Sequence, residues 1–93
     1  MGETAQEDAK YVRVDGLEVN RMPDGYVVYH AEQDKVHYLN PSASMIFELC
    51  TETTTVAAIT AYLQETYALA APPTGEVHAC LEELTAQGII RPC

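Results

Sequence analysis

The dipeptide Asn40-Pro41 constrains the fold of this 93-residue chain more than any other feature, because the residue pattern changes there from a strand to a helix. A residue before proline favours the extended backbone that a helix N-cap needs, and the side-chain oxygen of Asn40 can then accept a hydrogen bond from the first turn. Pro41 suits the first helical position, where a backbone N–H is not needed. Apolar residues follow at helical spacing, at Ala43, Ile46, Phe47 and Cys50. The segment therefore predicts a strand that leads directly into a helix.

Three segments have the composition and alternation of short β-strands. They are Leu17–Met22, Tyr26–His30 and Lys35–Leu39, and the first ends at the turn signal Pro23-Asp24-Gly25. Because the connections between them are short, an antiparallel meander is the simplest arrangement.

Beyond Asn40 the pattern predicts three helices, with apolar residues recurring every 3.6 positions. The first spans roughly Pro41 to Cys50. Thr55 can cap the second, whose apolar face holds Val56, Ile59, Leu63 and Tyr67. Thr74 can cap the third, whose core face holds Val77, Cys80, Leu81 and Leu84. Gly88 fits the left-handed position after a helix end, so Ile89 can fold back onto the third helix.

The expected order is therefore β-β-β-α-α-α, an α+β fold. The three helices are typical of a helix-turn-helix unit, and the strands would be its wing, so a winged helix-turn-helix is expected. Met1 to about Lys10 lacks aromatic and branched aliphatic residues and is expected to be a flexible tail. Residues 11–93 would form one domain.

Charge and composition exclude several classes of protein. Five Lys and Arg face fourteen Asp and Glu, for a formal net charge of −9, whereas phosphate-backbone binding needs clustered Lys and Arg. Nucleic acid is therefore not an expected partner. No apolar run approaches the roughly 20 residues of a membrane helix, and the N-terminus has no signal-peptide pattern. A cytoplasmic location without membrane attachment is expected.

Metal, cofactor and catalytic sites are also not expected. The spacing of His30, His37 and His78 matches no ligand motif, and the three cysteines form no Cys-x-x-Cys pair. Cys50 and Cys80 lie on apolar helical faces and should be buried. No nucleophile–base pattern or glycine-rich phosphate loop is present.

A set of motifs in fixed order resembles the PqqD family of leader-peptide recognition domains. It consists of Asp24-Gly25-Tyr26-Val27-Val28, His37 to Ala43 leading to Phe47-Glu48-Leu49-Cys50, the Thr55-Val56 helix start, and Leu81 to Leu84 with Gly88-Ile89-Ile90. The resemblance implies a non-catalytic peptide chaperone, or recognition element, of ribosomally made and modified peptides. Its partners would be the leader of a precursor peptide and a modifying enzyme, often a radical S-adenosylmethionine protein. The segment Tyr29–Glu32 lacks the Pro-Glu associated with proteins making pyrroloquinoline quinone (PQQ) itself, so the product stays open.

The resemblance implies that the leader lies as an extra strand against the third strand, in a groove walled by the third helix. The expected strand residues are Lys35, Val36, His37, Tyr38 and Leu39. Val36 and Tyr38 share one face and His37 and Leu39 the other, and period alone leaves open which face lines the groove. The expected helix residues are Val77, His78, Leu81, Glu82 and Thr85, with Leu81 at the boundary between core and groove.

Two other functions are compatible with the sequence. An adaptor that binds a folded partner would use the same exposed edge and groove. A DNA-binding winged helix would place the last helix in the major groove, but residues 74–87 contain three glutamates and no Lys or Arg, and would be repelled by phosphates.

Overall fold

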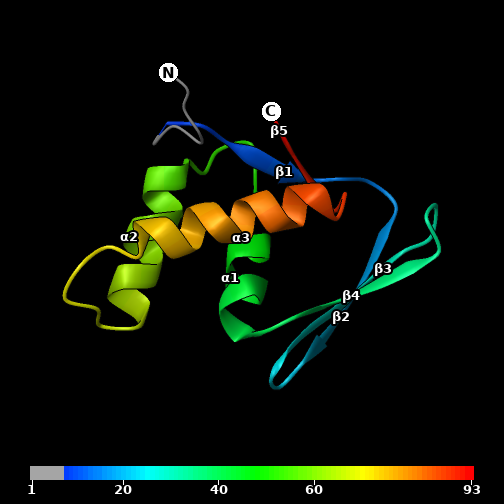
Figure 1. Cartoon of the computed structure of the whole chain (residues 1–93), viewed down its shortest axis with the longest axis horizontal. Coiled ribbons are helices and arrows are strands. Elements are labelled where there is room, and N and C mark those ends of the chain that lie inside the picture. Colours follow the sequence, from blue (N-terminus) through cyan, green and yellow to red (C-terminus); the bar gives the residue numbers. More distant parts are fainter. Residues whose placement is uncertain (1–7) are drawn as a thin grey trace.

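The computed structural model describes residues 8–93, which form one α+β unit. Three helices pack together, and a three-stranded sheet extends from one side of them (Figure 1). The elements in chain order are β1 (Tyr11–Arg13), β2 (Leu17–Met22), β3 (Gly25–His30), β4 (Lys35–Leu39), α1 (Pro41–Leu49), α2 (Val56–Thr66), α3 (Thr74–Ala86) and β5 (Ile90–Pro92).

The predicted meander is confirmed as an antiparallel sheet in the order β2-β3-β4. A two-residue turn joins β2 to β3, and a four-residue turn joins His30 to its partner Lys35. Within residues 8–93, β4 pairs with β3 alone, so one edge of β4 is open. The chain passes from the end of β4 through Asn40 directly into α1.

A second sheet, which the sequence pattern did not predict, pairs β1 with β5. It joins the two ends of the described chain above the helices (Figure 1). Ala9 and Lys10 also belong to the folded part, since the Ala9 carbonyl accepts a bond from the Val56 N–H at 2.9 Å and the Lys10 carbonyl one from the Cys93 N–H at 3.1 Å. The rest of the expected tail, Met1 to Glu7, lies outside the described residues.

The predicted start of α1 is confirmed. The Asn40 side chain accepts a hydrogen bond from the Ala43 N–H at 2.8 Å, and Pro41 is the first helical residue. Thr55 caps α2 in the same way, through the Ala58 N–H at 3.1 Å. The predicted Thr74 cap is wrong, because Thr74 is already inside α3 and Pro73 precedes it without a side-chain cap.

The end of α3 follows the prediction. Gly88 has a φ of +79°, and the Ile89 N–H bonds back to the Leu84 carbonyl at 3.2 Å. Ile89 is fully buried. The core that it joins contains residues of the sheet and of all three helices, among them Val28, Phe47, Ile59, Val77 and Leu81. Of the cysteines, Cys50 is buried as expected, whereas Cys80 is half-buried.

Glu48 of α1 ties the sheet to the helices. It accepts hydrogen bonds from Arg21 at 2.9 Å and from the Tyr26 hydroxyl at 2.6 Å, and Arg13 lies 3.4 Å away. The hydrogen bonds from Arg21 and then from Tyr26 hold the pKa of Glu48 below its ordinary value. One carboxylate thus fixes β1, β2 and β3 against α1.

Because the pKa of Glu48 is depressed in the folded state, its stabilising effect is present above about pH 4.5 and is lost as the pH falls through the folded-state pKa. Replacing Glu48→Gln should therefore lower the free energy of unfolding by about 0.5–1 kcal/mol at pH 7, since the group is partly exposed. Urea unfolding at pH 7 and pH 3 would measure the difference. The difference in free energy of unfolding between the wild type and Glu48→Gln should be smaller at pH 3 than at pH 7. An equal difference at both pH values would contradict the ionic role of Glu48.

Candidate functional site

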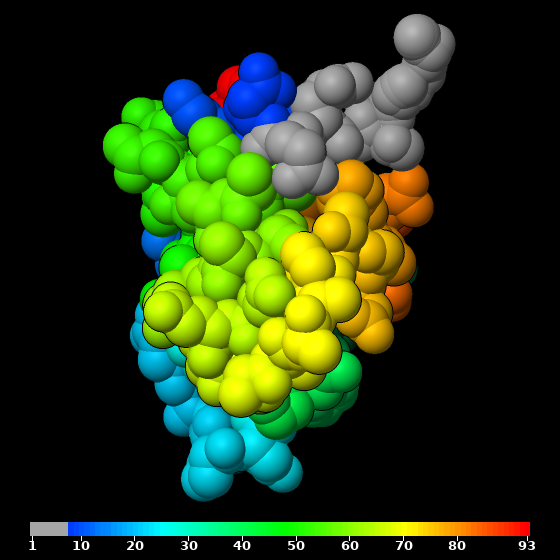
Figure 2. Space-filling model, turned by 90° about the vertical axis from the view of Figure 1, so that its left-hand side faces the viewer, coloured from blue at the N-terminus to red at the C-terminus, as the bar shows by residue number. Residues whose placement is uncertain are grey.

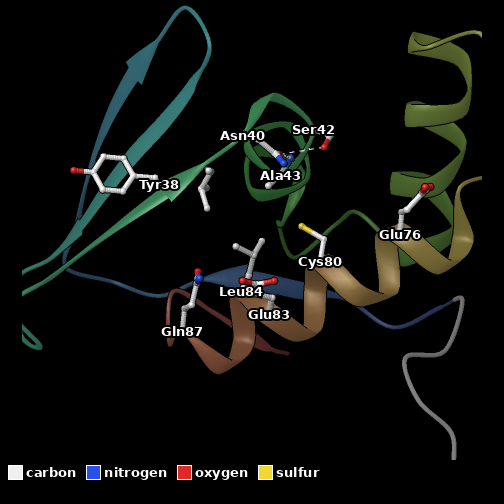
Figure 3. A pocket seen from close by; sticks show the side chains of 10 residues that line it. Tyr38, Asn40, Ser42, Ala43, Glu76, Cys80, Glu83, Leu84 and Gln87 are labelled. Carbon is white, nitrogen blue, oxygen red and sulfur yellow. Dashed lines mark hydrogen bonds between the residues drawn. The ribbon is translucent and has the colours of Figure 1, made fainter.

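A groove of about 290 Å³ lies where the end of β4 and the start of α1 face α3. Figure 3 shows its two walls, with the side chains of Asn40, Ser42 and Ala43 opposite those of α3. The β4–α1 wall consists of Tyr38, Leu39, Asn40, Ser42 and Ala43. The α3 wall consists of Glu76, Cys80, Glu83, Leu84 and Gln87.

The open edge of β4 reaches this groove at Tyr38. Gly25 of β3 pairs with Met22 of β2 at the two ends of a two-residue turn. The backbone N–H and C=O of Gly25 therefore bond toward β2. Hydrogen-bonding direction alternates along a strand, so Val28 bonds instead toward β4, to its partner His37. The neighbours of His37, namely Val36 and Tyr38, therefore turn their backbone N–H and C=O groups to the open edge.

The side chains of β4 divide as the alternation requires. Leu39 is buried and His37 half-buried, because both face the helices. Val36 and Tyr38 are 47% and 79% exposed and point away from the core, and Figure 3 shows Tyr38 directed away from α3. Lys35 is exposed at the start of the strand. The inner set thus covers the core, and the outer set extends the solvent-facing side of the sheet.

On α3, the structure places none of the five expected residues in the groove wall. Val77 and Leu81 are fully buried in the core, so Leu81 is not at a boundary. The Thr85 hydroxyl donates to the Leu81 carbonyl at 2.7 Å, Glu82 is exposed, and His78 is half-buried.

The groove wall is the opposite flank of the same helix. Residues 76, 80, 83 and 87 repeat at intervals of four, three and four and so form one stripe along α3. The core stripe of Val77, Leu81 and Leu84 separates it from the flank that holds His78, Glu82 and Thr85. Sequence periodicity identified the core stripe but carried no signal for which flank faces β4.

The groove is acidic, and the one thiol in its walls is unreactive. Glu76 and Glu83 are the charged residues in its walls, and no Lys or Arg lines it. Burial, helped by the charge of Glu83, raises the pKa of the Cys80 thiol to about 11, so the thiol is protonated at neutral pH. A protonated thiol is a poor nucleophile and acts here as an apolar lining group.

Residues 8–93 hold no group of three or more His, Cys, Asp and Glu side chains that could bind a metal ion. Over the same residues, no helix has both the length and the apolar character needed to cross a membrane.

No curated protein and no solved structure shows a significant match to the chain. Residues 25–90, well over half of the chain, match the family model described as Coenzyme PQQ synthesis protein D (PqqD). The matched range contains the β3–β4 hairpin, all three helices and both walls of the groove. This family is a non-catalytic accessory type of domain, and it suggests a role in the biosynthesis of PQQ or related modified peptides as a peptide-binding partner. Because this match covers most of the described chain, the chain belongs to the PqqD family.

Proposed function

We propose that this protein binds the leader segment of a ribosomally made precursor peptide as an added strand on β4 and presents it to a modifying enzyme. The observation that carries the proposal is the open edge of β4, which borders the groove against α3. An exposed edge offers unpaired backbone groups, and an extended peptide gains affinity by pairing with them.

The geometry suits such a peptide in two further ways. Val36 and Tyr38 offer two sets of backbone donors and acceptors, which is enough to hold four or five peptide residues in register. Alternate peptide side chains would then point into the groove and onto the outer face of the sheet, beside Val36 and Tyr38. The pairing supplies affinity, and the groove supplies specificity.

The remaining parts of the proposal follow from the family. The sheet and the three helices that follow it would act as a winged helix-turn-helix used for peptide recognition rather than for DNA. The enzyme that receives the peptide would be a radical S-adenosylmethionine protein or another maturation enzyme of the cytoplasm. The domain itself would hold no cofactor and carry out no chemical step.

An amide NMR titration tests this proposal, with the leader half of a short precursor peptide encoded beside the gene as the probe. We expect shifts at Lys35–Leu39 and along the groove flank of α3, Glu76 to Gln87. Shifts confined to α2, with none in β4, would overturn strand addition.

A proline in β4 makes a sharper test. Val36→Pro removes an N–H from the open edge and places a ring where the peptide must pair, without breaking a bond to β3. We expect at least about a tenfold loss of leader affinity by calorimetry, because one hydrogen bond and the close approach are both lost.

Val36→Ala is the matched control, since it shortens the same side chain and keeps the N–H. It should bind the leader within about threefold of the wild type, a difference of less than 1 kcal/mol. Equal losses in the two variants would show that the side chain, and not the backbone edge, carries the affinity. Circular dichroism would establish that both variants are folded.

One feature favours a second function, contact with a folded protein. The outer face of the sheet exposes Met22 by 51%, along with Val36 and Tyr38. Their register places all three on the outer side of the sheet, which meets the groove at Tyr38. The enzyme that receives the peptide is a partner of the right kind for this surface. DNA is disfavoured, because α3 carries three glutamates and no Lys or Arg.

A further inference from the structure

A second cavity adjoins the groove at the other end of α3. It has a volume of about 520 Å³ and lies between α1, α2 and the first turns of α3. Ser42, Glu76 and Cys80 line both the groove and this cavity, so the two hollows meet along one flank of α3. Figure 2 shows this side of the molecule, where the segment that joins α2 to α3 (yellow) lies between the two helices on the surface.

The cavity is built to hold an apolar side chain. Ile46, Leu63 and Val77 line it from the core, and each is at least 96% buried. Tyr67 and Leu69 also line it, yet they are 44% and 40% exposed. Large apolar side chains gathered at an open hollow, above a buried apolar lining, mark a binding site more often than isolated exposed residues do.

Charge indicates what kind of segment fits. Glu76 and Glu83 are the charged residues that line the two hollows, and neither hollow has a Lys or Arg in its walls. The chain as a whole carries a formal charge of −9. A peptide that carries Lys or Arg would therefore be attracted to this flank, and an acidic one would be repelled.

The spacing of the two glutamates determines how many peptide residues separate the basic residue from the apolar one. Glu83 follows Glu76 by seven positions along the helix, a rise of about 10 Å, which an extended peptide covers in about three residues. Glu83 lies in the groove beside β4, whereas Glu76 lies where the groove meets the apolar cavity.

We infer that the bound peptide continues from the β4 edge along α3 and inserts an aliphatic or aromatic side chain into the cavity. A Lys or Arg about three residues away pairs with Glu83, so the recognised class is a strand-forming segment with a basic residue and an apolar anchor at this spacing. The inference rests on the proposed function and adds the substrate class to it.

The test uses a displayed library of random twelve-residue peptides selected against the full chain. The wild type should enrich sequences with Lys or Arg two to four residues from a Leu, Ile, Phe or Met. Enriched peptides without this pair of features would overturn the inference.

Adjacent glutamates on α3 supply a matched pair of variants. Glu83 lines the groove, whereas Glu82 is exposed about 100° around the helix and lines neither hollow. Glu83→Lys should weaken binding of an enriched basic peptide by about tenfold or more and should select acidic residues in its place. Glu82→Lys should change the affinity by less than about twofold, although both variants alter the net charge equally. Equal effects would show that only the overall charge matters.

A second pair of variants tests the cavity. Ser42→Phe places a ring where the groove and cavity meet and should remove the preference for the apolar residue, whereas Ala57→Phe adds the same ring at an exposed position of α2 that lines neither hollow. An unchanged apolar preference in Ser42→Phe would overturn the anchor.

Val36→Pro separates this inference from the proposed function. If enriched peptides lose affinity for Val36→Pro but lack the basic and apolar pair, strand addition stands and the inference fails. If their affinity is unchanged in Val36→Pro, or if no peptide is enriched, both fail.

Discussion

Replacing Leu81 by aspartate is expected to unfold the protein. Leu81 is only 1% exposed and packs in the core shared by the sheet and the helices. Removing a buried leucine side chain costs about 2–5 kcal/mol, and a buried unpaired carboxylate adds to this cost. A small domain has only about 5–15 kcal/mol of stability, so most of it would be lost.

Circular dichroism and urea unfolding would measure the effect, with Glu82→Ala as the control on the exposed side of the same helix. The control should unfold within about 0.5 kcal/mol of the wild type. A folded Leu81→Asp variant with a normal urea midpoint would contradict the burial of this side chain. Because the variant unfolds, any loss of peptide binding that it shows says nothing about the groove.

Gly25→Ala should be the second most damaging change. Gly25 has a φ of +140°, which side chains rarely tolerate, and an added Cβ would meet the backbone carbonyl oxygen of Leu39. Strain of this kind costs about 1–3 kcal/mol, and the contact with backbone cannot be relieved by a rotamer change, so we expect a loss of about 2–5 kcal/mol. The contact lies at the end of β4, so the groove should be disturbed as well.

Two other glycines separate the cost of backbone strain from the cost of the contact with Leu39. Gly16 also has a positive φ, of +82°, but an added Cβ would meet nothing within 4 Å, so Gly16→Ala should show the cost of backbone strain alone, about 1 kcal/mol. Gly75 lies in α3 with open space around it, and Gly75→Ala should stabilise the protein by up to about 1 kcal/mol. The urea midpoint should therefore be highest for Gly75→Ala and then decrease through the wild type and Gly16→Ala to Gly25→Ala. Equal midpoints for the Gly16 and Gly25 variants would show that the contact with Leu39 is harmless.

The features that the sequence predicted correctly are local ones. The Asn40 and Thr55 caps and the end of α3 at Gly88 depend on residues a few positions apart, so the chain shows them directly. The strands of the meander are joined by short turns and are predictable for the same reason. The Thr74 cap failed because α3 begins one residue earlier than the threonine pattern indicates, with Pro73 at the N-cap position and Thr74 already helical.

The pairing of β1 with β5 could not be predicted from pattern. Each strand has three residues, too few for an alternation to be recognised, and they are joined across almost the full length of the described chain. The pairing exists because the helices bring the two segments together. Segments this short show no recognisable alternation in their sequence.

The two faces of β4 could be predicted from the sequence, whereas the flank of α3 that lines the groove could not. Alternation established that Val36 and Tyr38 share a face, and the burial of Leu39 shows that this is the outer one. On α3, the core stripe has two polar flanks, one with Glu76 and Glu83 and the other with Glu82. Which flank meets β4 depends on how α3 crosses α1, and that crossing is set by packing of the whole core rather than by the helix sequence.

The open edge of β4 also bears on how this protein behaves at high concentration. A strand that accepts a foreign segment accepts a copy of itself by the same backbone bonds, and this is the usual starting point for misassembly of sheets. The apolar outer face beside that edge adds to the hazard. A surplus of nine negative charges acts against it, because identical molecules repel one another before their edges meet. The acidity of the chain can thus be understood as protection of an open strand edge against pairing with other copies of the chain.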